Sequence, residues 1–304
     1  MKHLTDIGDC SPKQLISILQ LAANIAQDPD HLVDTLSGRL LVNLFYEAST
    51  RTRVSFEVAA KRLGMHVVNV SALGSSVEKG ESLEDTFHTI QAMMPDCVVV
   101  RHPDQGTALK LAEIADPGIH VINAGDGIAA HPTQALLDAL TLKQGFETLS
   151  EVRLVMAGDI RHSRVARSSI RLLTLLGIGE IRLCGPDGFV PPIAELADGN
   201  APVTCHDKLE DAVKGANAIM MLRIQKERII DVNVPGADEY HHKWGLRQEH
   251  LELAAPGCRV LHPGPMNRGV EIASEVADGP RSLIKTQVRN GLYVRMALLQ
   301  KLLT

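Results

Sequence analysis

The stretch Ser49–Arg53, which reads Ser-Thr-Arg-Thr-Arg, is the clearest candidate for chemistry in this 304-residue chain. It follows a short apolar run and opens a helical pattern, so its backbone N–H groups would lie unpaired at a helix N-terminus. The positive end of the helix dipole, hydroxyl donors and forked guanidinium groups together form an anion site. The stretch therefore predicts phosphate binding, and the alternative is an ordinary Ser/Thr helix cap followed by a solvated basic turn.

Further polar residues suggest carbonyl chemistry. His131 and Gln134 are three residues apart and would share one face of a helical turn. A histidine in that position polarises a carbonyl or donates to an oxyanion, and the alternative is a histidine that caps the helix start. Arg101 ends an apolar run, where it would be either a ligand-facing cation or a surface side chain on an apolar stem.

The second half of the chain has its own cationic candidates, Arg164 and Arg223, with Gln225 two residues further on. Two cations facing one cleft would suit a dicarboxylate, because each guanidinium fork matches a carboxylate. Taken one at a time, each of these residues is better explained as a surface residue.

These candidates follow short β-branched runs that alternate with helical patterns. The predicted strands are 40–45, 66–70, 96–100, 120–123, 153–157, 180–184, 202–205, 218–222 and 259–261. The predicted helices are 52–63, 82–94, 107–115, 134–144, 164–176, 209–214, 246–253 and the amphipathic tail 284–303, which contains Gly291. Apolar strands that alternate with helices indicate parallel sheets covered on both faces.

Nine strands exceed one small sheet, so we expect an α/β fold of two doubly wound parallel-sheet domains with an active-site cleft between them. The first would span residues 1–146 and the second 147–283, with the C-terminal helix 284–304 returning to pack on the first. In open α/β sheets, ligands bind beyond the carboxyl ends of the strands. Seven predicted strand ends carry polar or cationic residues or Pro/Gly loops, which favours one functional edge on each sheet.

Composition excludes several classes of protein. Hydrophobic residues make up 45% and charged residues 22%, as in globular proteins. A net charge of −5 and 3% aromatic residues argue against nucleic-acid binding, and no apolar run is long enough to span a membrane. Five scattered cysteines and the absence of a signal-peptide pattern predict a reduced, cytoplasmic protein.

Weaker motifs predict little. The stretch 125–130 matches the GxGxxA form of the dinucleotide fingerprint after a strand, but the acidic residue expected about 20 residues further on, at the end of a second strand, is missing. The chain has no Walker A, HExxH or EF-hand pattern, and its His and Cys residues lack zinc-like spacing, so we expect no metal site.

Taken in order, the motifs resemble those of the aspartate/ornithine carbamoyltransferase family, in particular the catalytic chains of aspartate carbamoyltransferases. The resemblance covers nearly the whole chain. The matching stretches are 45–53, 79–82, 101–103, 131–134, 158–164, 221–228 and 262–272.

The resemblance implies transfer of the carbamoyl group of carbamoyl phosphate to the amine of L-aspartate, which gives N-carbamoyl-L-aspartate and phosphate in pyrimidine synthesis. It also implies that the reaction needs no cofactor. The catalytic residues would be Arg51, Thr52, Lys79, Arg101 and His131. Carbamoyl phosphate would be bound by Ser49, Thr50, Arg51, Thr52, Ser75, Lys79, Arg101, His131 and Gln134. Aspartate would be bound by Lys79, Arg164, Arg223, Gln225, Gly264 and Pro265.

The resemblance also implies an assembly. Ser75 and Lys79 would come from a neighbouring subunit, which implies a homotrimer with shared active sites, and Glu47 would pair with Arg164 and Arg228 when the domains close. The stretch 264–269 differs from the Leu-Pro-Arg-Val-Asp type of the regulated enzymes. Partnership with a regulatory chain, partnership with a dihydroorotase-like chain and a lone trimer therefore all remain open.

The acceptor can be argued from the residues. Arg164 and Arg223 suit a carboxylate, whereas an ornithine enzyme must accommodate a cationic side chain. The chain also has His-Pro-Thr-Gln at 131–134 rather than the His-Pro-Cys-Gln typical of ornithine enzymes. The alternatives are a carbamoyltransferase for another amine such as ornithine, or a catalytically silent homologue that acts as a scaffold.

Overall fold

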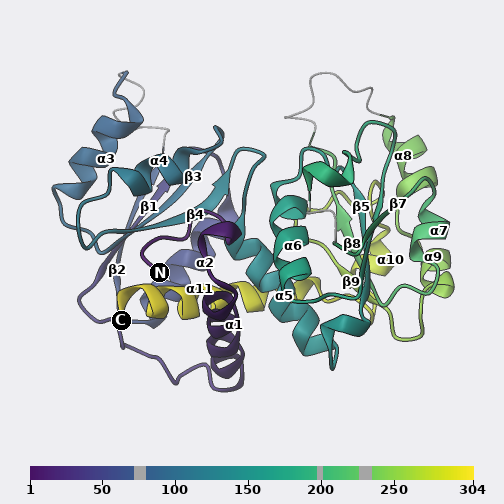
Figure 1. Ribbon diagram of the computed structural model, residues 1–304, viewed down its shortest axis with the longest axis horizontal. Helices are drawn as coiled ribbons and strands as arrows, with labels where there is room; N and C mark the ends of the chain where they lie inside the picture. The colour runs from purple at the N-terminus through teal and green to yellow at the C-terminus, as the bar shows by residue number, and fades with distance from the viewer. Residues whose placement is uncertain (72–79, 197–200, 226–234) are drawn as a thin grey trace. The chain divides into compact units, whose positions relative to one another are not determined.

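The computed structural model describes residues 1–71, 80–196, 201–225 and 235–304. Within these residues the chain forms two compact units (Figure 1). One unit comprises Met1–Leu140 with Arg289–Thr304, and the other comprises Thr141–Val288. Two helices, α5 (Pro132–Gly145) and α11 (Ile284–Leu303), begin in one unit and end in the other.

The first unit is built on four parallel strands in the order β2-β1-β3-β4. They are β1 (Leu40–Phe45), β2 (His66–Ser71), β3 (Cys97–His102) and β4 (His120–Asp126). The inner strands β1 and β3 are almost continuously buried, as expected for a parallel sheet with helices on both faces. β2 is an edge strand, and most of its residues are exposed.

Helices surround this sheet and supply its core. They are α1 (Pro12–Gln27), α2 (Thr50–Arg62), α3 (Leu83–Gln91) and α4 (Thr107–Glu113), preceded by a 3-10 turn at Ile7–Asp9. Phe87 of α3 and Leu111 of α4 pack with Val42, Val98 and Val121 of the strands.

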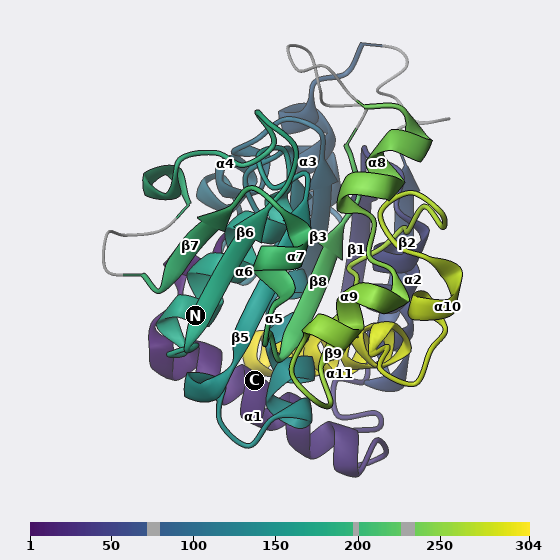
Figure 2. The same cartoon turned by 90° about the vertical axis from the view of Figure 1, so that its right-hand side faces the viewer.

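The second unit has five parallel strands in the order β7-β6-β5-β8-β9, which lie side by side in Figure 2. They are β5 (Arg153–Gly158), β6 (Glu180–Cys184), β7 (Val203–His206), β8 (Ala218–Leu222) and β9 (Arg259–Leu261). The helices are α6 (Arg164–Leu175), α7 (Leu209–Val213), α8 (Ala237–Trp244), α9 (Gln248–Leu253) and α10 (Ser274–Ala277), with 3-10 turns at Leu149–Glu151 and Ile193–Glu195.

The predicted α/β class with two parallel sheets is confirmed, and all nine predicted strands are present among the described residues. Four of them, β1, β6, β8 and β9, have the predicted bounds, as does the tail helix to Leu303. The prediction omitted α1, although Ser11 before Pro12 forms a capping box with Gln14 that marks a helix start. It also omitted α8 and α10. No helix in the described part of the chain is both long and apolar enough to cross a membrane.

Candidate active site

The strand order of the first unit creates a switch point between β1 and β3. The chain leaves β1 toward β2 on one side, and β3 and β4 follow on the other side. The connections after β1 and β3 therefore diverge, and the crevice between diverging connections is where open α/β sheets bind ligands. Phe45 at the end of β1 is in register with Arg101 of β3, and the N–H of Tyr46 donates to the Arg101 carbonyl at 2.8 Å. The predicted site residues Ser49–Thr52 follow β1, and Arg101 is the next-to-last residue of β3.

The helix N-terminus at this switch point has no side-chain cap. Ser49 occupies the N-cap position of α2 in an extended conformation, but its hydroxyl makes no capping hydrogen bond, and the first turn has no acidic residue. Thr50 and Arg51 are exposed, whereas Thr52 is buried. The Ser49 side chain therefore does not cap the helix, and the positive dipole end of α2 favours an anion at this position.

Arg101 extends from the end of β3 in a buried position. Its Nη2 donates to Oε1 of Glu47 at 2.5 Å, and its Nη1 donates to the carbonyl of Ala124 at 3.1 Å. These bonds connect the side chain to the segment after β1 and to β4. Because Arg101 is only 8% exposed, it is a fixed cation at the switch point and not a snorkelling surface residue.

The segment after β4 places His131 and Gln134 at the start of α5. The N–H groups of Gln134 and Ala135 donate to the His131 carbonyl, so His131 immediately precedes the helix. Both side chains are buried, and Nε2 of Gln134 donates to Asp138 at 3.0 Å within the helix. Because β4 is the neighbour of β3, both residues belong to the same edge of the sheet as Arg101.

The glycine motif at 125–130 has a structural explanation. Gly127 has φ +49°, and a Cβ at this position would lie 2.9 Å from the Pro103 carbonyl. Asp126 accepts from the N–H groups of Gly106 at 2.8 Å and Thr107 at 3.1 Å, which ties the end of β4 to the start of α4. Glycine at 127 therefore permits a close backbone approach, with no dinucleotide needed to explain it.

The second unit has its own switch point, between β5 and β8. The chain proceeds from β5 outward to β6 and β7 and then returns to β8 on the other side of β5. Gly158 ends β5 in register with Leu222 of β8, and a Cβ at Gly158 would lie 2.0 Å from the Leu222 carbonyl. Only glycine permits this approach, which places Asp159 close to the segment 223–225.

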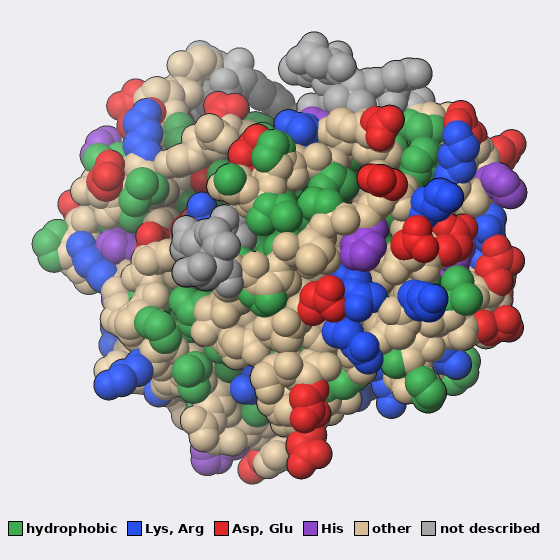
Figure 3. All heavy atoms as spheres, turned by 45° about the vertical axis from the view of Figure 1, so that its right-hand side comes forward, with side chains coloured by type: hydrophobic (Ala, Val, Ile, Leu, Met, Phe, Trp, Pro, Cys, Tyr) green, Lys and Arg blue, Asp and Glu red, His purple; other side chains and the backbone are tan. Residues whose placement is uncertain are grey.

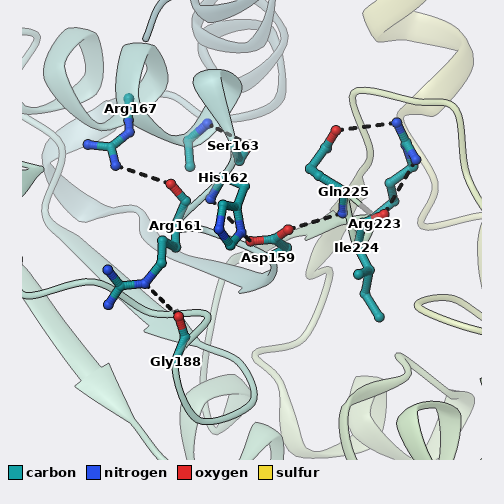
Figure 4. Close-up of polar contacts among 10 residues, drawn as sticks. Asp159, Arg161, His162, Ser163, Arg167, Gly188, Arg223, Ile224 and Gln225 are labelled. Atoms are coloured by element: carbon teal, nitrogen blue, oxygen red, sulfur yellow. Dashed lines mark hydrogen bonds and ion pairs between the residues drawn. The ribbon is translucent and has the colours of Figure 1, made fainter. Parts of the chain in front are cut away.

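The carboxylate of Asp159 bridges the two segments at this switch point (Figure 4). One oxygen accepts from the N–H of His162 at 3.2 Å and lies 2.9 Å from its Nδ1, and the other accepts from the N–H of Gln225 at 3.0 Å. Arg223 in turn donates from Nη2 to Oε1 of Gln225 at 3.2 Å. Since Asp159 is fully buried, these contacts fix the orientation of Arg223 and Gln225.

The other residues predicted to bind aspartate lie at the start of α6 and after β9. Arg164 is the first residue of α6 and is 4% exposed, and the N-cap hydroxyl of Ser163 accepts from the N–H of Ala166. Gly264 and Pro265 follow β9, the neighbour of β8. The N–H of Gly264 donates to Nδ1 of the buried His262, so the backbone of this loop is also held in place.

Some expected residues lie outside the described part of the chain. They are Ser75, Lys79 and Arg228. The predicted pairing of Glu47 with Arg164 and Arg228 therefore stays a prediction, and within the first unit Glu47 accepts from Arg101.

Sequence reasoning gave no role to Asp159, although an acidic residue directly after a strand-ending glycine was the available signal. It also gave no role to Asp126, which has the same kind of position after Gly125.

The thiols are poorly suited to nucleophilic chemistry. Burial raises the pKa of Cys10 to about 11 and that of Cys184 and Cys258 to about 12, and it raises the pKa of Cys97 further. Across the described ranges, no three His, Cys, Asp or Glu side chains gather as a metal site would require. Acidic and basic side chains are interspersed on the face drawn in Figure 3.

Comparison with known proteins places both halves of the chain in one family. Residues 2–144 match the model described as aspartate/ornithine carbamoyltransferase, carbamoyl-P binding domain. Residues 150–302 match the model described as aspartate/ornithine carbamoyltransferase, Asp/Orn binding domain.

Individual relatives cover nearly the whole chain. The aspartate carbamoyltransferase catalytic subunit of Brucella ovis is 47% identical over 305 residues, which cover 99% of this chain and 92% of the relative. Aspartate transcarbamoylase from Trypanosoma cruzi, solved with carbamoyl aspartate and phosphate, has TM-score 0.88 and 30% identity and covers 100% of this chain and 96% of its own. Ornithine carbamoyltransferase from Thermus thermophilus has TM-score 0.88 and 28% identity, and the match covers 100% of this chain and 99% of the relative. The fold alone therefore does not discriminate between the two acceptors.

Proposed function

Because the chain belongs to the aspartate/ornithine carbamoyltransferase family, we propose that it transfers the carbamoyl group of carbamoyl phosphate to the amine of L-aspartate in pyrimidine synthesis. One observation carries this proposal. The switch point of each sheet bears groups that can bind an anion. In the first unit they are Arg101 and a helix N-terminus without a side-chain cap. In the second unit they are Arg223 and Gln225, which are held in place through Asp159. A phosphate and a dicarboxylate are the ligands that these two sets of groups suit.

The first unit supplies the carbamoyl phosphate residues of this proposal. The N-terminus of α2, from Ser49 to Thr52, holds the phosphate through N–H groups, hydroxyls and the Arg51 guanidinium. Thr52, Arg101 and His131 donate to the carbonyl oxygen, and Gln134 binds the carbamoyl amide. Their burial supports these roles, because donors in a site shielded from water stabilise a developing oxyanion more strongly.

The chemistry follows from where charge develops. The aspartate amine attacks the carbonyl carbon, a C–N bond forms, and the carbonyl oxygen becomes an oxyanion. The C–O bond to the phosphate then breaks, and the phosphate departs with the electron pair and accepts the proton that the amine loses. The protein contributes chiefly orientation and electrostatic stabilisation.

The second unit determines the acceptor. Arg164 and Arg223 are cations near the ends of β5 and β8, and Gly264 and Pro265 present backbone after β9. A dicarboxylate can pair both of its carboxylates with these cations, whereas ornithine attacking through its δ-amine would present one carboxylate beside a repelled α-ammonium group. The 47% identity to a catalytic subunit named for aspartate favours the same acceptor.

We further propose a homotrimer in which Ser75 and Lys79 complete the site of a neighbouring subunit. Exposed apolar side chains on the edge of the first unit support an interface there. Val54 and Val58 lie one turn apart on α2 and are 45% and 38% exposed, and Val68 of the edge strand β2 is 48% exposed. The exposed valine pair on α2 fits burial against another chain. The regulatory or dihydroorotase-like partner and the cytoplasmic location stay predictions.

Calorimetric titration with a bisubstrate analogue that joins a phosphonate to aspartate tests substrate recognition, and native mass in the same buffer tests the trimer. We expect tight binding and a mass of three chains. Tighter binding of an analogue that carries ornithine in place of aspartate would contradict the proposed acceptor. A monomeric mass in the presence of the aspartate analogue would contradict the shared site. Mixing Lys79→Ala with His131→Ala chains should restore activity in hybrid trimers.

A further inference from the structure

The guanidinium of Arg295 is buried deep in the first unit, and its hydrogen-bond partners are all neutral. Nη1 donates to the Ser55 hydroxyl at 3.1 Å and to the Gly291 carbonyl at 2.9 Å, and Nη2 donates to the Thr133 hydroxyl at 3.4 Å. Its Cζ lies 4.9 Å from the centre of the Phe56 ring, and the residue is 3% exposed. This cation stacks on an aromatic ring, and among the described residues no carboxylate is in hydrogen-bond contact with it.

Such a group is costly to bury, because desolvation of a charge is repaid only by close partners. Burial lowers the pKa of Arg295 to about 10, and the nearby Asp138 opposes that shift. The side chain therefore stays charged at neutral pH. A buried charge whose hydrogen-bond partners are all neutral, with Asp138 as a nearby opposite charge, is costly to maintain.

The helix is adapted to hold this side chain. Gly291 lies one turn before Arg295 on α11, and a Cβ there would lie 2.6 Å from Nη1 of Arg295 and 3.2 Å from Cδ2 of Leu137. Any side chain at 291 would therefore displace the guanidinium. This accounts for a glycine inside a long helix, which costs about 1 kcal/mol relative to alanine.

The two hydroxyl partners belong to the helices that begin at the proposed carbamoyl phosphate site. Ser55 lies one turn along α2 from Arg51, and Thr133 lies between His131 and Gln134 at the start of α5. The single guanidinium thus joins the second turn of α2 to the first turn of α5.

We propose that Arg295 is a positioning residue that holds the N-termini of α2 and α5 together and keeps a positive charge behind the carbamoyl phosphate site. This inference rests on the proposed function of that site. Arg295 acts through Ser55 and Thr133 and does not itself touch the substrate. Its loss should therefore weaken binding of the phosphate substrate more than binding of aspartate.

The test compares Arg295→Met with Arg289→Met, a matched change at an exposed arginine on the same helix. Calorimetry would measure the Kd of inorganic phosphate and of carbamoyl phosphate. Steady-state kinetics would measure the KM for aspartate, and urea titration would measure the folded fraction of each variant. We expect phosphate and carbamoyl phosphate to bind about tenfold more weakly to Arg295→Met, which corresponds to about 1.4 kcal/mol. The aspartate KM should change little, and Arg289→Met should match the wild type.

Folded Arg295→Met protein that binds phosphate with the wild-type Kd would overturn the proposal and leave Arg295 a merely structural role. If that variant does not fold, Thr133→Val and Gly291→Ala, which keep the arginine, replace it. Each should weaken phosphate binding several-fold, and an unchanged Kd in both would overturn the proposal. Failure of the wild type itself to bind carbamoyl phosphate would refute the proposed function instead.

Discussion

Glu47 and Arg101 form an ion pair at the carboxyl edge of the first sheet, with Nη2 of the arginine 2.5 Å from Oε1 of the glutamate. The Glu47 side chain is 25% exposed, and the Arg101 side chain is only 10% exposed. The pair therefore holds a guanidinium in place between the connections that follow β1 and β3. An arginine held in this way fits the role proposed for it, which is to stabilise charge that develops on a bound carbonyl.

The first prediction concerns this arginine. Arg101→Ala should lower kcat by about 10²–10³-fold, because one preorganised oxyanion donor is lost. The control is Arg39→Ala, which removes an ion pair with Asp96 in which the Arg39 side chain is 51% exposed. Steady-state assays of carbamoyl transfer measure the change in kcat, and circular dichroism verifies that the variants are folded. A rate near that of the wild type in Arg101→Ala would remove the proposed role.

Arg223 provides the second prediction. Arg223→Ala should raise the KM for aspartate by roughly 10–100-fold, since a charged hydrogen bond contributes about 1.5–3 kcal/mol. The Kd for carbamoyl phosphate should be unchanged, because its proposed ligands belong to the first unit. Arg153→Ala, at the opposite end of β5, is the matched control. Equal losses for both substrates would show that the substitution disturbs more than acceptor binding.

The third prediction concerns Asp159, which is fully buried and accepts hydrogen bonds on both oxygens. Asp159→Asn replaces one acceptor oxygen by a donor, so either the His162 or the Gln225 N–H loses its partner. Leaving such a group unpaired costs about 1–3 kcal/mol. We expect a lower free energy of unfolding and a raised KM for aspartate. A variant with lower stability but unaltered aspartate kinetics would limit Asp159 to a structural role.

Much of this arrangement could be predicted from the sequence. A strand such as Leu40–Phe45 is a short apolar run, so its position can be recognised from neighbouring residues alone. Its predicted bounds agree with the structure. The site residues at strand ends followed from the same local patterns and from the resemblance of ordered motifs. The helix Pro12–Gln27 also has local start signals, which were overlooked.

What could not be predicted depends on strand order. Asp159 reaches the Gln225 N–H, 66 residues away, only because β5 and β8 are neighbours. Likewise, Arg295 meets Ser55 only because the last helix returns to the first unit. The spacing of residues in the sequence does not reveal such pairings, because they depend on which strands and helices are neighbours in the fold.

The fourth prediction is a pH dependence of stability. Burial, together with the nearby Lys2 and His120, lowers the pKa of His3 from 6.5 to about 4, and its Nδ1 accepts from the Val121 N–H at 3.1 Å. Between these two pKa values the unfolded chain binds more protons than the folded chain. The free energy of unfolding should therefore decrease as the pH falls from 6.5 to 4. Burial also lowers the pKa of His102 and His250, which adds to the same trend.

Urea titrations at pH 7.5, 5.5 and 4.5 measure this dependence. His3→Asn keeps an acceptor near the Val121 N–H but removes the titrating group, so the decrease should be smaller than in the wild type. His31→Asn, the same substitution at an exposed position, is the matched control. Identical pH dependence in His3→Asn and the wild type would show that His3 does not contribute.

The most direct test of the central claim is the steady-state rate of carbamoyl transfer with L-aspartate and with L-ornithine, followed by release of phosphate and by identification of the carbamoylated product. The proposed chemistry predicts saturable formation of N-carbamoyl-L-aspartate with one phosphate released per turnover, and no transfer to ornithine. Turnover with ornithine alone, or no transfer to either amine by folded protein, would contradict it.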